Sequence, residues 1–222
     1  MSFLSELILH IETATKICSV GLSEGGKLLS CIDREPDDYI HGEYLTLFIQ
    51  EILSENHKAL KDLNAISVSI GPGSYTGLRI GLAVAKGLCY GLNIPIISIE
   101  TLDSLLEIGK QKYLSDTLCA VIDARRMEVY SKIKSPQGNL LSKASATIVE
   151  DHTFSRCEPF VCFGDGAEKL IELWSDRSIK IDKDIKLSAS GQVQLAIEKY
   201  RNEMFDGLAY LKPMYLKEFK IG

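Results

Sequence analysis

The residues most suggestive of chemistry lie between positions 71 and 81, where the chain reads GPGSYTGLRIG. Backbone N–H groups at a glycine-rich turn that opens a helix attract anions, so a phosphate site must be considered. A Walker loop would need Gly-Lys-Ser/Thr at its close, and the string contains no lysine. A nucleophile elbow would need glycine two residues on either side of Ser74, where Pro72 and Thr76 stand. We therefore interpret the string as a tight turn and a helix start, capped by Ser74 or Thr76.

Histidine and cysteine do not have the spacing of a metal site. The four histidines form no H-x-x-x-H or H-E-x-x-H pair, and the six cysteines form no C-x-x-C pair. Scattered cysteines of this kind are typical of reduced thiols in a cytosolic protein. The sequence therefore predicts no metal site of its own.

Composition and charge exclude several other classes of protein. The 222 residues include 25 Lys and Arg against 30 Asp and Glu, a net charge of −5, without a basic arm. Tight binding of RNA or DNA by the chain alone is therefore not expected. The most apolar stretch, residues 65–99, is interrupted by Arg79 and Lys86, and no basic leader opens the chain. We expect a cytoplasmic protein without a membrane contact.

The elements that position these residues alternate in two similar halves. Strands are predicted at residues 7–11, 17–22, 27–32, 65–70, 94–99, 118–122, 128–133 and 159–163. Helices are predicted from Asp37 or Asp38 to about Asn56, and at residues 76–92, 101–112, 167–174 and 191–204. This order predicts an α/β fold with an N-terminal lobe at 1–103 and a shorter C-terminal lobe at 104–222. The last helix can pack back on the first lobe.

Several motifs, in this order along the chain, resemble those of the bacterial TsaB (YeaZ) family. They are IETAT at 11–15, HGEYL at 41–45, the string at 71–81, IDARRMEVY at 122–130 and PMYLK at 213–217. The resemblance covers most of the chain and is strongest between residues 66 and 102. It implies a two-lobed actin-like ATPase (ASKHA, ribonuclease H-like) fold with a reduced second lobe.

The resemblance also implies a function in tRNA modification. Members of the family act with the catalytic subunit TsaD and the ATPase TsaE. Together these proteins transfer a threonylcarbamoyl group to the adenosine beside the anticodon, and TsaC-type enzymes supply the activated group. The resemblance thus implies a non-catalytic scaffold that has no cofactor of its own. ATP and metal are expected to bind to the partner subunits. Because the chain has a net charge of −5 and no basic cluster, we expect it to contact tRNA only through the complex. We also expect a homodimer in isolation, because the apolar helix at 76–92, described below, would favour self-association.

Two carboxylates need separate consideration, because kinases of this fold hold phosphates on glycine-rich hairpin turns. Here the corresponding turns carry Thr13 and Ala14 in the first lobe and residues 124–126 (ARR) in the second. Glu12 and Asp123 precede these turns and are weak candidates to flank a magnesium ion. The alternative is that each carboxylate caps its own strand turn. A stand-alone ATPase or kinase-like enzyme and a metallopeptidase-like protein remain as alternative functions.

The helix at 76–92 is the most informative physical feature, because Arg79 and Lys86 are its only charged residues. A helix that is apolar all round must be covered on more than one side. It either lies inside its own fold or packs on its own sheet and on a partner chain, together with the helix near Tyr44. We expect the second arrangement. The candidate partner interface is Tyr44, Phe48, Gly77, Gly81, Leu82, Val84, Ala85 and Leu88.

Overall fold

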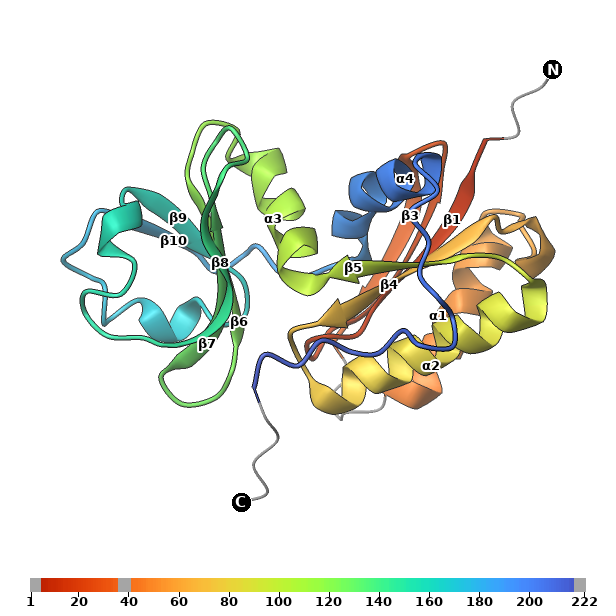
Figure 1. Ribbon diagram of the computed structural model, residues 1–222, viewed down its shortest axis with the longest axis horizontal. Helices are drawn as coiled ribbons and strands as arrows, with labels where there is room; N and C mark the ends of the chain where they lie inside the picture. Colours follow the sequence, from red (N-terminus) through yellow and green to blue (C-terminus); the bar gives the residue numbers. More distant parts are fainter. Residues whose placement is uncertain (1–4, 36–40, 218–222) are drawn as a thin grey trace.

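The computed structural model describes residues 5–35 and 41–217. Its strands form two five-stranded sheets, which lie in two lobes (Figure 1). The first sheet has the order β3-β2-β1-β4-β5, and the second has the order β8-β7-β6-β9-β10. The two orders are identical when the strands are counted within each lobe. The second lobe therefore repeats the first, and the predicted two-lobed α/β fold of actin-like topology is confirmed.

The first sheet begins as an antiparallel meander and continues with parallel strands. Its strands are β1 (Leu7–Glu12), β2 (Cys18–Glu24), β3 (Lys27–Arg34), β4 (Ala65–Gly71) and β5 (Ile96–Glu100). β2 is antiparallel to β1 and to β3, whereas β4 is parallel to β1 and to β5. Gly25 and Gly26 form the β2–β3 turn with φ angles of 61° and 83°, which glycine adopts without steric cost. The predicted hairpin is thus present.

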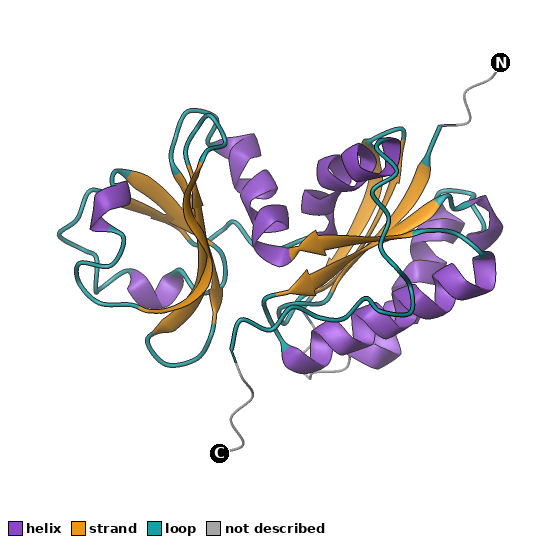
Figure 2. Ribbon diagram, viewed as in Figure 1, coloured by secondary structure: helices purple, strands orange, loops and turns teal. Residues whose placement is uncertain are grey.

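Helices cover both faces of the first sheet (Figure 2). α1 (His41–Glu55) and α2 (Tyr75–Leu92) pack on one face, where they meet Leu9 and Ile11 of β1. α4 (Val193–Arg201) packs on the other face, where it meets Ile8. Successive side chains of a strand point to opposite faces, which explains this alternation along β1. The predicted start of the first helix, Asp37 or Asp38, lies outside the described residues.

The second sheet has little helical cover of its own. Its strands are β6 (Leu118–Asp123), β7 (Glu128–Lys134), β8 (Leu140–Ile148), β9 (Phe160–Phe163) and β10 (Ile179–Asp182). α3 (Thr101–Lys112) covers one face through Leu102, Leu105 and Leu106. The other face packs on Leu170 and Trp174, which are completely or almost completely buried. The second lobe is therefore reduced in its helices rather than in its sheet.

Four details of the second half differ from the sequence prediction. The helix predicted at 167–174 is wrong: the segment contains only the 3-10 helix Glu168–Leu170 and turns that bring Trp174 into the core. β8 was not predicted, because its residues LLSKASATI are mixed in polarity and none is fully buried. β10 was not predicted either, and its four residues are too short for a periodic pattern. The last helix is shorter than predicted, since residues 189–192 form a 3-10 turn before α4.

The helices that follow the two sheets tie the lobes together. α3 begins directly after β5 but packs mainly on the second sheet, where Asp103 forms ion pairs with Lys132 and Lys134 of β7 (2.7 Å each). α4 follows the second sheet but packs on the first. The predicted boundary between residues 103 and 104 falls in the first turn of α3. Within the described part of the chain, no helix is long and apolar enough to cross a membrane.

Candidate functional site

Glu12, the first of the two candidate carboxylates, ends β1 and is completely buried. Its Oε1 accepts a hydrogen bond from the backbone N–H of Ala14 (2.9 Å). Its Oε2 accepts hydrogen bonds from the hydroxyl of Ser69 and from Nε2 of Gln192, the latter at 3.4 Å. Burial raises the pKa of Glu12 to about 7, although these hydrogen bonds act in the opposite direction. Both oxygens thus already have donors, and the side chain caps its strand turn.

Glu12 belongs to a buried polar network that the sequence did not reveal. His10 lies two residues earlier, with Nδ1 2.6 Å from the hydroxyl of Ser67 and Nε2 2.7 Å from that of Ser23. Ser67 in turn donates to Oε1 of Gln192 (2.6 Å). Burial lowers the pKa of His10 to about 3, so its imidazole is neutral at physiological pH. The network joins three strands of the first sheet to the segment that precedes α4.

The turn after Glu12 is occupied by the start of α2. Ala14 accepts a backbone hydrogen bond from Ser74 (2.6 Å), and the hydroxyl of Thr13 donates to the carbonyl of Gly77 (2.8 Å). A Cβ atom on Gly77 would lie 2.1 Å from the carbonyl oxygen of Thr13, and one on Gly73 would lie 2.4 Å from that of Ala14. Only glycine permits this approach. The glycine-rich string therefore packs α2 on the turn, and Ser74 caps the helix by accepting from the N–H of Gly77 (3.2 Å).

Asp123, the second candidate carboxylate, is exposed and caps the corresponding turn of the second lobe. Its Oδ1 accepts from the N–H of Arg125 (3.2 Å) and forms an ion pair with Lys169, while its own N–H donates to Asp165 (3.0 Å). In the described residues no hydrogen bond or common partner joins Asp123 to Glu12. Nor do those residues contain a group of three or more His, Cys, Asp or Glu side chains that could hold a metal ion. Each carboxylate thus caps its own turn, and a cation between the two stays a prediction.

The predicted partner interface divides into a covered half and an accessible half. The covered residues, which are buried within the chain's own fold, are Gly77, Gly81, Leu82 and Ala85. The turn after β1 covers Gly77 and Gly81, and the first sheet covers Leu82 and Ala85, so these four residues are not open to a partner in this conformation. Phe48, Val84 and Leu88 are partly buried on the same core, and Tyr44 is 38% exposed and stacks on Phe48. For these four residues a partner contact stays a prediction.

A second side of α2 is covered by a distant part of the chain. Residues 205–217 run alongside the helix (Figure 1). Lys86 donates through Nζ to the carbonyl of Ala209 (3.5 Å), and Arg79 donates through Nε to the hydroxyl of Tyr215 (3.0 Å). Both charged residues of the helix thus form hydrogen bonds within the chain. Sequence reasoning did not foresee this cover, because the contact spans more than a hundred residues.

The middle of α2 has an exposed strip that contains two small residues. Ala83 and Gly87 are exposed, and a Cβ atom on Gly87 would meet nothing within 4 Å. Tyr90 lies on the same side, since residues 83, 87 and 90 fall on one face of a helix, and it is 83% exposed. On the neighbouring α1, Tyr44 and Leu47 are also exposed. We call these five residues the α1–α2 surface.

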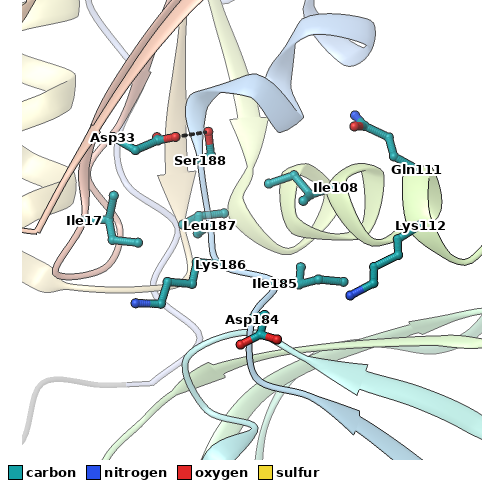
Figure 3. Close-up of a pocket in the computed structure, with 10 residues that line it drawn as sticks. All are labelled: Ile17, Asp33, Ile108, Gln111, Lys112, Asp184, Ile185, Lys186, Leu187 and Ser188. Carbon is teal, nitrogen blue, oxygen red and sulfur yellow. Dashed lines mark hydrogen bonds between the residues drawn. The ribbon is translucent and has the colours of Figure 1, made fainter.

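An open cavity of about 660 Å³ lies between the lobes (Figure 3). Its apolar lining is Ile17, Ile108, Ile185 and Leu187, and its polar lining is Asp33, Gln111, Lys112, Asp184, Lys186 and Ser188. Most of the polar groups already have partners within the chain. Asp33 accepts from Ser188 (3.2 Å), and Lys112 forms an ion pair with Asp182 (2.7 Å). The cavity therefore presents no set of free polar groups that converge on one ligand.

Comparison with known proteins identifies the family. The family model described as "TsaD: tRNA N6-adenosine threonylcarbamoyltransferase" matches residues 39–216. The chain is similar to "tRNA threonylcarbamoyladenosine biosynthesis protein TsaB" of Escherichia coli, with 28% identity over 95% of this chain and 94% of the relative. The TsaB protein of Haemophilus influenzae is 32% identical over 55% of this chain and 51% of its own length.

A solved structure agrees with these sequence matches. YeaZ from Pseudomonas aeruginosa superimposes with a TM-score of 0.80 and 25% identity, and the match covers 95% of this chain and all of the other. The agreement therefore includes both lobes. The chain thus belongs to the family of TsaD-type domains and, within it, to the TsaB (YeaZ) group.

Proposed function

We propose that the chain takes part in the biosynthesis of threonylcarbamoyladenosine in tRNA as a subunit without a catalytic site of its own. In this proposal it binds a TsaD-type catalytic subunit, which carries out the transfer, and acts with a TsaE-type ATPase. ATP and metal are held by these partners, and tRNA is bound through the complex. The process takes place in the cytoplasm. The names of the relatives support the pathway, and the geometry of the chain supports the role within it.

The observation that carries the non-catalytic role is the filling of the first hairpin turn. In an actin-like kinase this turn must leave room for phosphate oxygens beside free backbone N–H groups. Here the N–H of Ala14 is bonded to Glu12, and its carbonyl is bonded to Ser74 at the start of α2. Glu12 is completely buried and accepts hydrogen bonds on both oxygens, so it is engaged within the fold rather than exposed to solvent. A nucleotide could enter only if α2 moved away from the turn.

The partner contact is assigned to the α1–α2 surface. Helices approach each other closely where side chains are small, and Ala83 and Gly87 provide such a place. Tyr44, Leu47 and Tyr90 supply large exposed apolar area on either side, and aromatic residues of this kind anchor protein interfaces. The same surface is expected to pair two copies of the chain when the catalytic subunit is absent.

A reconstitution experiment tests the proposal. The purified chain alone is assayed for ATP turnover and peptidase activity, and then combined with the TsaC-, TsaD- and TsaE-type proteins of the same organism. Threonylcarbamoyladenosine is measured by mass spectrometry of digested tRNA. We expect no activity from the chain alone and a strict requirement for it in the mixture. ATP turnover by the isolated chain would favour the stand-alone ATPase instead, and full modification without the chain would refute the proposed function.

A further inference from the structure

The turn between β6 and β7 carries two adjacent arginines in an unusual backbone conformation. Arg125 and Arg126 have φ angles of +68° and +50°, in the left-handed region that favours glycine and asparagine. Both side chains are exposed. Residues held in such a conformation cost free energy, and they cluster at functional sites. Hairpin turns often contain residues with positive φ, but these are usually glycine, asparagine or aspartate. The fold thus explains the backbone conformation but not the choice of two long cationic side chains.

The turn is held in place from behind. Lys169 donates through Nζ to the carbonyl oxygens of Arg126 (2.8 Å) and Glu128 (2.6 Å) and forms an ion pair with Asp123. Asp123 also accepts from the backbone N–H of Arg125 (3.2 Å). These bonds fix the backbone, so the two guanidinium groups project from a constrained turn. The lower end of the second lobe, where this turn lies, is free of helices in Figure 1.

The charge of the two arginines is not neutralised within the described part of the chain. The carboxylates that flank the turn already have cationic partners, since Asp123 is paired with the lysine just described and Glu128 with Lys217. The side chains of Arg125 and Arg126 make no hydrogen bond or ion pair with any other described residue. The turn thus presents two free guanidinium groups on a chain with a net charge of −5.

We propose that Arg125 and Arg126 bind phosphate groups of the tRNA backbone while the complex holds its substrate. This inference rests on the proposed function. The planar guanidinium group matches a phosphate with two parallel hydrogen bonds. A protein partner would instead require an apolar core around the arginines, and Met127 is the only exposed apolar side chain of the turn. A phosphate contact needs no such core.

Two contacts of this kind are too few to hold tRNA on their own. Non-specific binding grows with the number of neutralised phosphates, so the isolated chain binds weakly, as its negative charge also predicts. In the complex the catalytic subunit already holds the tRNA. Once the tRNA is held there, its phosphates are at a high effective concentration near Arg125 and Arg126, so these additional contacts form readily. The turn therefore contributes to substrate affinity only when the complex is assembled.

The test uses the chain assembled with its TsaC-, TsaD- and TsaE-type partners. Arg125→Asn and Arg126→Asn, alone and combined, remove the charge, and asparagine accepts the left-handed backbone, so folding is retained. Arg156→Asn is the matched control, because Arg156 is an exposed arginine in another part of the second lobe. KM for unmodified tRNA and kcat are measured, together with the Kd of the complex for tRNA at several salt concentrations.

We expect the double variant to raise KM and Kd for tRNA roughly tenfold, with kcat unchanged and a salt slope reduced by about 1.5. The control should match the wild type. Equal KM and Kd in the double variant and the control would overturn the proposal, while the proposed function would stand. Loss of the protein partner in size-exclusion chromatography would overturn it in favour of a protein contact. A wild-type chain that does not support modification would refute the proposed function itself, and this inference with it.

Discussion

Substitutions at Gly87 separate the stability of the chain from its partner contact. Gly87 lies in the interior of α2, is exposed, and leaves open space within 4 Å of the position that a Cβ atom would take. Glycine inside a helix is less stable than alanine by roughly 0.5–1 kcal/mol. Gly87→Ala and Gly87→Glu should therefore both stabilise the isolated chain. For a chain of this size the gain raises Tm by about 1–4 °C.

The effect on the partner contact has the opposite sign and grows with the size of the new side chain. A methyl group can be accommodated at a close helix contact, whereas a glutamate adds volume and a charge that loses water on binding. Overpacking of this kind costs about 1–3 kcal/mol, which corresponds to a roughly 5- to 150-fold weaker Kd. We expect Gly87→Ala to bind within a few-fold of wild type and Gly87→Glu to lose most of the association.

Three measurements check this prediction. Differential scanning calorimetry gives Tm, analytical ultracentrifugation of the chain alone gives the self-association constant, and co-purification with the TsaD-type subunit gives the heteromeric contact. A matched substitution on α3, Gln111→Glu, adds the same charge at an exposed helix position away from the α1–α2 surface. If Gly87→Glu folds with a raised Tm and still binds its partners as tightly as Gln111→Glu, the assigned surface is wrong.

Three further predictions concern the hairpin turns. The pKa of Glu12 is about 7 in the folded chain, against a reference value of 4.5. Between these two pH values the folded state binds a proton that the unfolded state does not bind. The free energy of unfolding should therefore fall as pH rises from 4.5 to 7. Glu12→Gln should abolish that decline in urea titrations at pH 5 and pH 8, and an unchanged decline would contradict the assignment. Asp123→Ala should leave tRNA modification by the assembled complex within a few-fold of wild type, and a thousandfold loss in a folded variant would reveal a catalytic role. Gly77→Ala should destabilise the fold by about 3 kcal/mol, because the new Cβ meets the carbonyl of Thr13, whereas Gly91→Ala has open space and should not.

The sequence predicted the fold well where local patterns determine it. The meander of β1 to β3 follows from short apolar runs separated by glycine turns, and the start of α2 follows from the glycine-rich string at 71–81. The second lobe was predicted less completely. β8 is mixed in polarity along its length, and β10 is only four residues long, so neither has a period that can be recognised.

The partner surface was predicted only in outline, for a physical reason. The sequence shows that α2 is apolar all round but does not show which side each neighbour covers. The first sheet covers Leu82 and Ala85, and residues 205–217 cover the side of Arg79 and Lys86. The contacts of residues 205–217 with α2 join positions more than a hundred residues apart in the sequence, and no local pattern encodes them. Only the structure leaves Gly87 and its neighbours as the open strip.

The β1–β2 turn and the β6–β7 turn occupy the same position in the two lobes, but their surroundings differ. This difference bears on the role of the chain. An enzyme of this fold would direct both turns at one nucleotide. Here the first turn is closed by α2 and by the buried Glu12, so it contributes packing. The second turn is open and carries Arg125 and Arg126, so it contributes charge. One turn is thus packed inside the fold and the other presents two arginines that are unpaired among the described residues, and this difference supports the proposed role of a subunit that binds other molecules.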